Sequence, residues 1–185
     1  MAHIAAGTLK GFRLAAPRHI RLTEGKVRQA LFNILGSRVI GARVVDAFAG
    51  SGALGLEALS RGAREAVFLE SDPRCCRALR QNLLRIGAGR VDGEGRLVPG
   101  DVLRTLPRLR GGPVDLLLMD PPYQGALGTK ALRVASACGI LAASGSLCLE
   151  HARHADVPRE VGELTLSTQH RYGQTVLSFY QRRSP

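Results

Sequence analysis

Hydrophobic residues along the chain follow two patterns. Short continuous apolar runs, as in strands covered on both faces, occur at 43–48, 66–70, 96–98, 114–119 and 146–150. Segments in which apolar residues recur every three or four positions, as in helices that bury one face, lie at 54–61, 73–86 and 126–138. Strands that alternate with helices predict an α/β fold with a doubly wound, mainly parallel sheet.

Both ends of the chain depart from this alternation. Strand-like runs at 2–6 and 11–15 predict a small N-terminal β-hairpin. A helix is expected to follow, with Thr23 as its N-cap and Gly36 at its end. Towards the carboxyl end, two alternating runs predict an antiparallel hairpin at 163–169 and 175–181.

The charge of the chain is concentrated near its N-terminus. The 185 residues include 26 basic and 15 acidic ones, a net charge of +11, and residues 1–40 hold seven of the basic residues against one acidic residue. We therefore divide the chain into a basic N-terminal extension, residues 1–40, and an α/β domain, residues 41–185. Such a charge favours a polyanionic partner, although a solvated surface has the same composition. The candidate contacts with such a partner, for which RNA is one possibility, are Lys10, Arg13, Arg21, Lys26 and Arg28.

The cysteines and the apolar segments exclude several classes of protein. The four cysteines have neither the spacing of metal ligands nor that of a disulfide framework, so no metal site is expected. Charged residues interrupt the first twenty positions, which argues against a signal peptide. The longest uncharged run, 134–149, is shorter than the roughly 20 apolar residues of a membrane helix. A cytoplasmic protein without a membrane partner is predicted.

A glycine-rich segment follows the first strand of the α/β domain. Asp46 lies near the end of that strand, and Gly50, Gly52 and Gly55 form a G-x-G-x-x-G pattern directly before a helix. Glycines allow a tight turn and the close approach of backbone to a ligand, and the helix N-terminus adds N–H donors. The pattern alone is also typical of an ordinary strand-to-helix turn.

Acidic residues follow the next two strands. Glu70 lies about 20 residues beyond the glycines, where a carboxylate can accept hydrogen bonds from ribose hydroxyls. Asp101 follows the third strand and could bind an adenine amino group or cap a helix. Because ligands of such sheets bind at the carboxyl ends of the strands, these residues indicate an adenosine-containing cofactor, either a nicotinamide dinucleotide or S-adenosylmethionine.

The fourth strand is followed by Asp120, Pro121, Pro122 and Tyr123. The two prolines stiffen the backbone, so that the Asp120 carboxylate and the Pro121 carbonyl can accept hydrogen bonds from an exocyclic amine. The tyrosine offers a flat face on which a flipped base can stack. An amine held in this way can attack an activated methyl group roughly 3 Å distant. The four residues favour methyl transfer to a base over hydride transfer.

The chain resembles the class I methyltransferases with an Asp-Pro-Pro-Tyr motif, and more narrowly the RsmD family, which makes N2-methylguanine in 16S ribosomal RNA. The resemblance runs over nearly the whole chain. Its most specific stretch is residues 48–62, and it also includes 4–11, 27–35, 120–123 and 172–173.

The resemblance implies a seven-stranded, S-adenosylmethionine-dependent methyltransferase fold with a small N-terminal extension on the RNA side. Asp46 and Gly50 would approach the methionine part of the cofactor, and Asp120 and Tyr123 would hold the target guanine. The family's target is the guanine at position 966 of 16S rRNA, within a partly assembled small subunit. The implied cofactor contacts are Asp46, Phe48, Gly50, Ser51, Gly52, Glu70, Asp101 and Val102.

Other functions share some of these features. The chain departs from the family pattern at 21–23 and 25–29, where RNA would be gripped. An N6-adenine DNA methyltransferase uses the same motif, but 185 residues leave little room for a DNA-recognition domain. A protein-glutamine methyltransferase does not account for the basic extension. A nicotinamide oxidoreductase leaves residues 120–123 unexplained, and a non-catalytic RNA-binding assembly factor would not need them.

Overall fold

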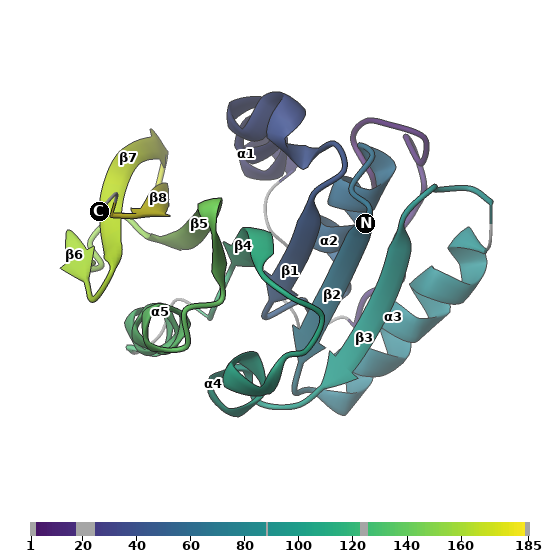
Figure 1. Cartoon of the computed structure of the whole chain (residues 1–185). Coiled ribbons are helices and arrows are strands. Elements are labelled where there is room, and N and C mark those ends of the chain that lie inside the picture. The colour runs from purple at the N-terminus through teal and green to yellow at the C-terminus, as the bar shows by residue number, and fades with distance from the viewer. Residues whose placement is uncertain (1–2, 18–24, 88, 123–125, 184–185) are drawn as a thin grey trace.

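A single mixed sheet runs through the protein. The computed structural model describes residues 3–17, 25–87, 89–122 and 126–183. The strands are β1 (Arg43–Ala47), β2 (Glu65–Glu70), β3 (Glu94–Pro99), β4 (Val114–Met119), β5 (Leu141–Ala152), β6 (Glu160–Val161), β7 (Leu164–Tyr172) and β8 (Thr175–Arg182). Within the described residues these eight strands form one sheet in the order β3-β2-β1-β4-β5-β8-β7-β6 (Figure 1).

Parallel pairing joins the first five strands of this sheet. β1 pairs with β2 and β4, β2 with β3, and β4 with β5, all in parallel. β8, β7 and β6 extend the sheet from β5 through antiparallel pairs. The predicted mainly parallel sheet with an antiparallel C-terminal hairpin is therefore confirmed. The sheet has one strand more than expected, because β6 is two residues long and too short to show a periodicity in the sequence.

Helices cover both faces of the sheet. They are α1 (Gly25–Leu35), α2 (Ala53–Ser60), α3 (Pro73–Ile86), α4 (Val102–Thr105) and α5 (Leu127–Ala137), with 3-10 turns at Gly36–Val39 and Leu106–Arg108. Successive residues of a strand point to opposite faces. Val44 therefore packs with α1, α2 and α3 in a first core. Val45 packs with α4 and α5 in a second core on the other face.

The N-terminal segment, residues 3–15, lies against α2 and α3. The hairpin predicted here is reduced to one isolated bridge, between His3 and Arg13. Some backbone groups of the segment bind each other, as the Ile4 N–H does the Phe12 carbonyl at 3.0 Å. Others bind side chains of the helices: the Ala15 N–H donates to Asn82 Oδ1 at 2.8 Å. Three of its apolar side chains are buried in the first core, namely Ile4, Leu9 and Leu14.

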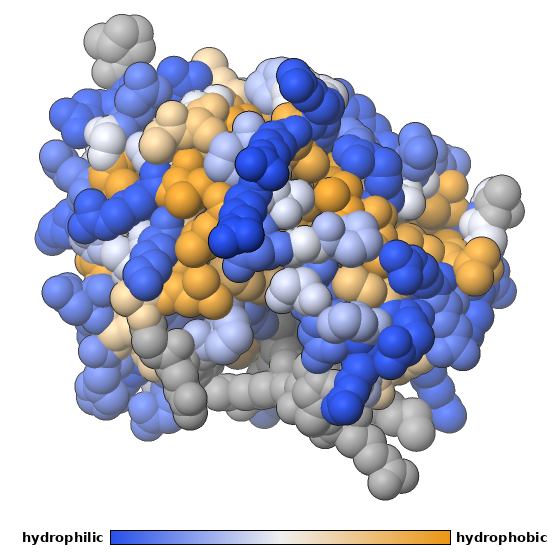
Figure 2. All heavy atoms as spheres, turned by 90° about the horizontal axis from the view of Figure 1, so that it is seen from below, coloured by the Kyte–Doolittle hydropathy of each residue, from blue (hydrophilic) through white to orange (hydrophobic). Residues whose placement is uncertain are grey.

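The carboxyl ends of β1, β2 and β3 point downward in Figure 1. Figure 2 views the molecule from that side and shows apolar atoms, in orange, across the middle of the surface between hydrophilic residues in blue. Among the helices described, none combines the length and the apolar character needed to cross a bilayer. Ligands of parallel sheets bind on the side seen in Figure 2.

Candidate active site

Four carboxylates lie at the carboxyl ends of adjacent strands. Asp46 is in β1 and Glu70 ends β2, while Asp101 follows β3 and Asp120 follows β4. The strand order β3-β2-β1-β4 places these ends next to one another. The structure therefore brings together residues that lie up to 74 positions apart in the sequence (120 − 46).

Asp46 is buried, and its side chain contacts the first turn of α2. Its side chain is 1% exposed, and Oδ2 accepts a hydrogen bond from the Gly55 N–H at 2.8 Å. Burial raises the pKa of Asp46 to about 7; the Gly55 hydrogen bond opposes this rise, and the charges of Asp120 and Glu70 add to it. A nearby cation would favour the ionised form of Asp46. The site is therefore suited to a positively charged ligand group.

Glu70 holds the glycine loop in place. Its Oε2 accepts from the Gly50 N–H at 2.6 Å, and its Oε1 accepts from the N–H groups of Ser71 and Asp72 at 2.8 and 2.7 Å. A carboxylate has about four acceptor positions, and three are used by these backbone donors. One position remains that could accept a ribose hydroxyl.

The loop between β1 and α2 contains a strained residue. Phe48 has φ 71°, and no other non-glycine residue in the described ranges has a positive φ. A Cβ at Gly52 would lie 2.4 Å from Leu79 Cδ1, and one at Gly55 would lie 2.3 Å from Phe68 Cε1. Packing therefore explains why Gly52 and Gly55 are glycines, without reference to a ligand. Packing does not explain the positive φ of Phe48. Backbone strain of this kind costs about 1–3 kcal/mol and is commonly found at functional sites.

Ser51 has a buried hydroxyl beside this loop. Its side chain is 1% exposed, and Oγ has no hydrogen-bond partner among the described residues. The Ser51 carbonyl accepts from Asn82 Nδ2 at 3.0 Å, and the same Nδ2 donates to the Ala15 carbonyl at 2.9 Å. A buried polar atom without a partner costs free energy, so Ser51 Oγ fits a site in which a ligand supplies the partner.

Asp101 has a structural role. It is the N-cap of α4, and its Oδ1 accepts from the Arg104 N–H at 3.2 Å. Asp101 is exposed while Val102 is buried. The structure therefore confirms that Asp101 caps a helix. That Asp101 and Val102 contact an adenine stays a prediction.

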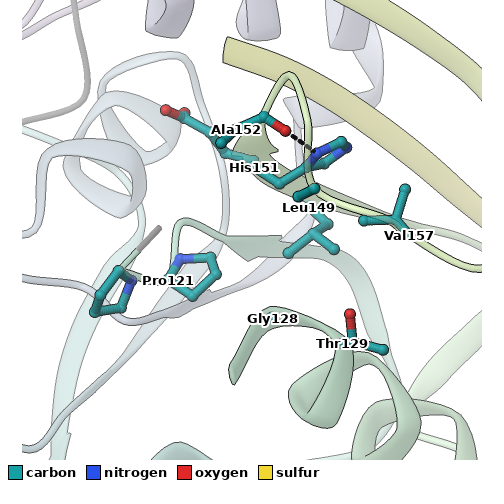
Figure 3. Close-up of a pocket in the computed structure, with 10 residues that line it drawn as sticks. Pro121, Gly128, Thr129, Leu149, His151, Ala152 and Val157 are labelled. Atoms are coloured by element: carbon teal, nitrogen blue, oxygen red, sulfur yellow. Dashed lines mark hydrogen bonds between the residues drawn. The ribbon is translucent and has the colours of Figure 1, made fainter. Parts of the chain in front are cut away.

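The Asp-Pro-Pro part of the motif lies at the end of β4. Pro121 is buried and Pro122 is exposed, and Tyr123 lies outside the described residues. A small pocket adjoins the two prolines (Figure 3). Its other lining residues include Gly128, Thr129, Leu149, His151, Ala152 and Val157. Leu149 belongs to the second core, so the pocket lies on the α5 face of the sheet.

His151, in the wall of this pocket, was not anticipated from the sequence. Its Nδ1 lies 2.9 Å from the Ala152 carbonyl, which can only accept, so Nδ1 carries the proton. Nε2 then accepts from the Ser178 hydroxyl at 2.7 Å, and Gln169 Nε2 donates to the same oxygen at 2.9 Å. Burial lowers the pKa of His151, in agreement with a neutral ring.

The predicted RNA contacts divide into three groups. Lys10, Arg13 and Lys26 are exposed, and Arg21 lies outside the described residues. The prediction for Arg28 is wrong. Its side chain is 2% exposed, and its guanidinium donates to the His3 carbonyl and faces the Glu57 carboxylate, with Nε 3.4 Å from Oε2.

Glu57 is the residue of α2 that sequence reasoning missed. It is fully buried and accepts from the backbone N–H groups of Ala5 and Ala6 at 2.7 and 3.1 Å. It also pairs with Arg28 and, at 2.9 Å, with Arg61. The available signal was a single acidic residue inside an otherwise apolar helix, since a buried carboxylate requires partners.

The described residues contain no group of three or more histidine, cysteine or acidic side chains arranged to hold a metal ion. The four cysteines are free thiols. Burial raises the pKa of the Cys148 thiol, which keeps it protonated at neutral pH.

Comparisons with known proteins agree with this geometry. Residues 2–181 match the family described as Conserved hypothetical protein 95. The Ribosomal RNA small subunit methyltransferase D of Escherichia coli (strain K12) is 32% identical over 183 residues, which cover 98% of this chain and 90% of that protein. A Bacillus subtilis (strain 168) protein, YlbH, described as an rRNA methyltransferase, is 29% identical over 184 residues, covering 97% of this chain and 98% of that one.

A solved structure extends the match to the fold. A protein of Escherichia coli described as a methyltransferase superposes with a TM-score of 0.85 at 31% identity, covering 100% of this chain and 99% of that chain. The match therefore includes the N-terminal segment as well as the sheet. Since the family match spans nearly the full length, this chain belongs to the Conserved hypothetical protein 95 family.

Proposed function

We propose that this protein transfers a methyl group from S-adenosylmethionine to the exocyclic N2 amine of a guanine in 16S rRNA, with S-adenosylhomocysteine as the second product. The observation that carries the proposal is the position of Asp120 and Pro121 at the strand end beside the glycine loop held by Asp46 and Glu70. The name of the E. coli relative supports the substrate class. The rRNA of an assembling small subunit, in the cytoplasm, is the proposed partner.

The charge of the site supports this cofactor. Asp46, Glu70 and Asp120 interact electrostatically, and the pKa of Asp46 is raised partly by the other two. S-adenosylmethionine carries positive charge on its sulfonium and on its ammonium group, which such carboxylates attract. The diphosphate of a nicotinamide dinucleotide would be repelled. We assign Asp46 and Gly50 to the methionine part, Glu70 to the ribose and Ser51 Oγ to a hydrogen bond with the cofactor.

The reaction needs little covalent help from the protein. The cofactor supplies a methyl group activated by the positive sulfur. The Asp120 carboxylate and the Pro121 carbonyl accept the two N–H groups of the guanine amine and orient its nitrogen towards that methyl group. With the cofactor bound, the nitrogen would take the methyl group as the carbon–sulfur bond breaks, and the proton hydrogen-bonded to Asp120 would pass through that carboxylate to solvent. The negative charge of Asp120 stabilises the positive charge that develops on the nitrogen.

The RNA would approach across the N-terminal segment. Lys10 and Arg13 are exposed there and Lys26 is exposed at the start of α1, while Asn82 ties the segment to the glycine loop through Ala15 and Ser51. We infer that residues 1–40 form the RNA side of the enzyme. Phosphate contacts of this kind make binding steeply salt-dependent.

Labelled methyl transfer from S-adenosylmethionine tests the proposal. The acceptors are small ribosomal subunits that lack the modification, naked 16S rRNA and double-stranded DNA, followed by nucleoside analysis. We expect N2-methylguanosine from the RNA acceptors and no transfer with Asp120→Ala, which should still bind the cofactor. N6-methyladenine in DNA would instead establish the DNA methyltransferase alternative. Transfer by Asp120→Ala at the wild-type rate would refute the assigned site.

A further inference from the structure

Glu150 is a buried carboxylate without a role in the mechanism above. It lies in β5, and its side chain is 5% exposed. Burying a carboxylate is costly unless the charge has a use or compensating partners. β5 is the neighbour of β4, and Asp120 directly follows β4. Glu150 can therefore lie close to the amine that Asp120 is proposed to hold.

The sheet register places Glu150 beside Asp120. β4 and β5 are parallel, and Leu118 pairs with Cys148 and Met119 with Leu149. Continued by one residue, this register sets Asp120, directly after β4, beside Glu150 of β5. Neighbouring strands lie about 4.8 Å apart.

Both side chains belong to the same face of the sheet. Leu118 and Cys148 pack in the first core, and Met119 and Leu149 pack in the second. Because strand side chains alternate between faces, Asp120 and Glu150 continue the row of Leu118 and Cys148. That face carries α1, α2 and the N-terminal segment.

A second observation agrees with this placement. Burial is the main cause of the raised pKa of Cys148, and the charges of Glu150 and Asp120 both contribute to it. Each carboxylate is therefore close to the same thiol, one row below them. The two acceptors form a pair at the edge where the target base must be held.

We propose that Glu150 accepts a hydrogen bond from N1–H of the target guanine and thereby selects guanine over adenine. The inference rests on the proposed function. In guanine, N1–H and the N2 amine are adjacent donors on the Watson–Crick edge, so two neighbouring carboxylates match them. Adenine has a lone pair at N1, which a carboxylate repels. Glu150 is thus a specificity-determining residue, while Asp120 orients the amine.

The test uses 2-aminopurine in place of the target guanine in the RNA acceptor. This base keeps the N2 amine but has an acceptor at N1 and lacks O6, so the effect of Glu150→Gln on the ratio of the two bases isolates the N1 contact. We expect wild-type kcat/KM to fall by about 5- to 150-fold, the range of one specific base contact. Glu150→Gln can donate from its amide to that N1. Its ratio of guanine to 2-aminopurine kcat/KM should fall at least tenfold below the wild-type ratio.

Two controls make the outcomes distinct. Glu94→Gln makes the same chemical change at an exposed position at the amino end of β3 and should keep the wild-type ratio. Cofactor binding by calorimetry reports whether Glu150→Gln is folded. If it is not, the wild type alone still tests the inference, because a contact at N1–H requires guanine to react faster than 2-aminopurine. Equal wild-type rates on the two bases, or a ratio unchanged by Glu150→Gln, would overturn the inference and leave the proposed function standing. Failure of the wild type to form N2-methylguanine would overturn both.

Discussion

Neutralising Asp46 should stabilise the cofactor-free protein at and above neutral pH. The pKa of Asp46 is about 7 in the folded protein against an ordinary value of 3.8. Between these values the folded protein holds a proton that the unfolded chain has released. The free energy of unfolding therefore falls as the pH rises from about 4 to about 7 and is level above that. A pKa difference of about three units corresponds to a loss of at most roughly 4 kcal/mol in the free energy of unfolding. Asp46→Asn cannot ionise and so avoids this loss, and its amide oxygen can still accept from the Gly55 N–H.

Urea unfolding at several pH values measures the effect. We expect the stability difference between Asp46→Asn and the wild type to grow by about 1.4 kcal/mol per pH unit between roughly pH 4 and 7, and then to stay constant. Asp156→Asn, at an exposed position, should show no such trend. The same Asp46→Asn variant should bind S-adenosylmethionine more weakly. A stability difference independent of pH, or a wild type more stable than the variant at pH 8, would show that Asp46 is ionised in the folded protein and would refute the reasoning.

Three further predictions concern stability and protonation. Glu57→Gln should lower the free energy of unfolding by about 3–5 kcal/mol in urea, because Arg28 would stay buried without its counter-charge. Gly55→Ala should cost about 1–3 kcal/mol, since its Cβ would overlap the Phe68 ring. The His151 ring should titrate below 6.5 in NMR spectra, because burial lowers its pKa; its contribution to stability is then present above pH 6.5 and is lost as the pH falls.

Matched substitutions separate these effects from general damage. Glu94→Gln, at an exposed site, should leave stability within about 0.5 kcal/mol of the wild type. Gly25→Ala adds a methyl group where no atom lies within 4 Å and should not destabilise the protein. If Glu57→Gln were no more destabilising than Glu94→Gln, the buried ion pair would have no net role. A His151 titration above 6.5 would contradict the neutral, buried ring.

The sequence was sufficient for the parallel part of the sheet and for the strand ends. Apolar runs such as 114–119 are continuous because both faces of a central strand are covered, so they stand out without structural information. Asp46, Glu70 and Asp120 were located because each lies near the carboxyl end of such a run or directly after it. Parallel topology then requires that their positions meet at one edge of the sheet.

Tertiary contacts account for what the sequence did not reveal. Arg28 looks like any other residue of a basic segment, and only the packing of α1 on α2 shows that it neutralises Glu57. The N-terminal hairpin is shorter than predicted because side chains of distant helices, such as Asn82, bind part of its backbone. Glu150 ends an apolar run, so the sequence pattern alone does not mark it as a site residue. Its position beside Asp120 depends on the register of two strands.

The anchoring of the N-terminal segment has a consequence for how the chain folds. Its backbone is bound by side chains 50 to 70 positions further on, since Ala5 pairs with Glu57 at a separation of 52 residues and Ala15 with Asn82 at 67. Contacts of such long range form slowly, because a large loop must close before they gain any energy. During synthesis this segment precedes its partners by more than fifty residues. The basic stretch that we place on the RNA side therefore docks only after α3 has been made.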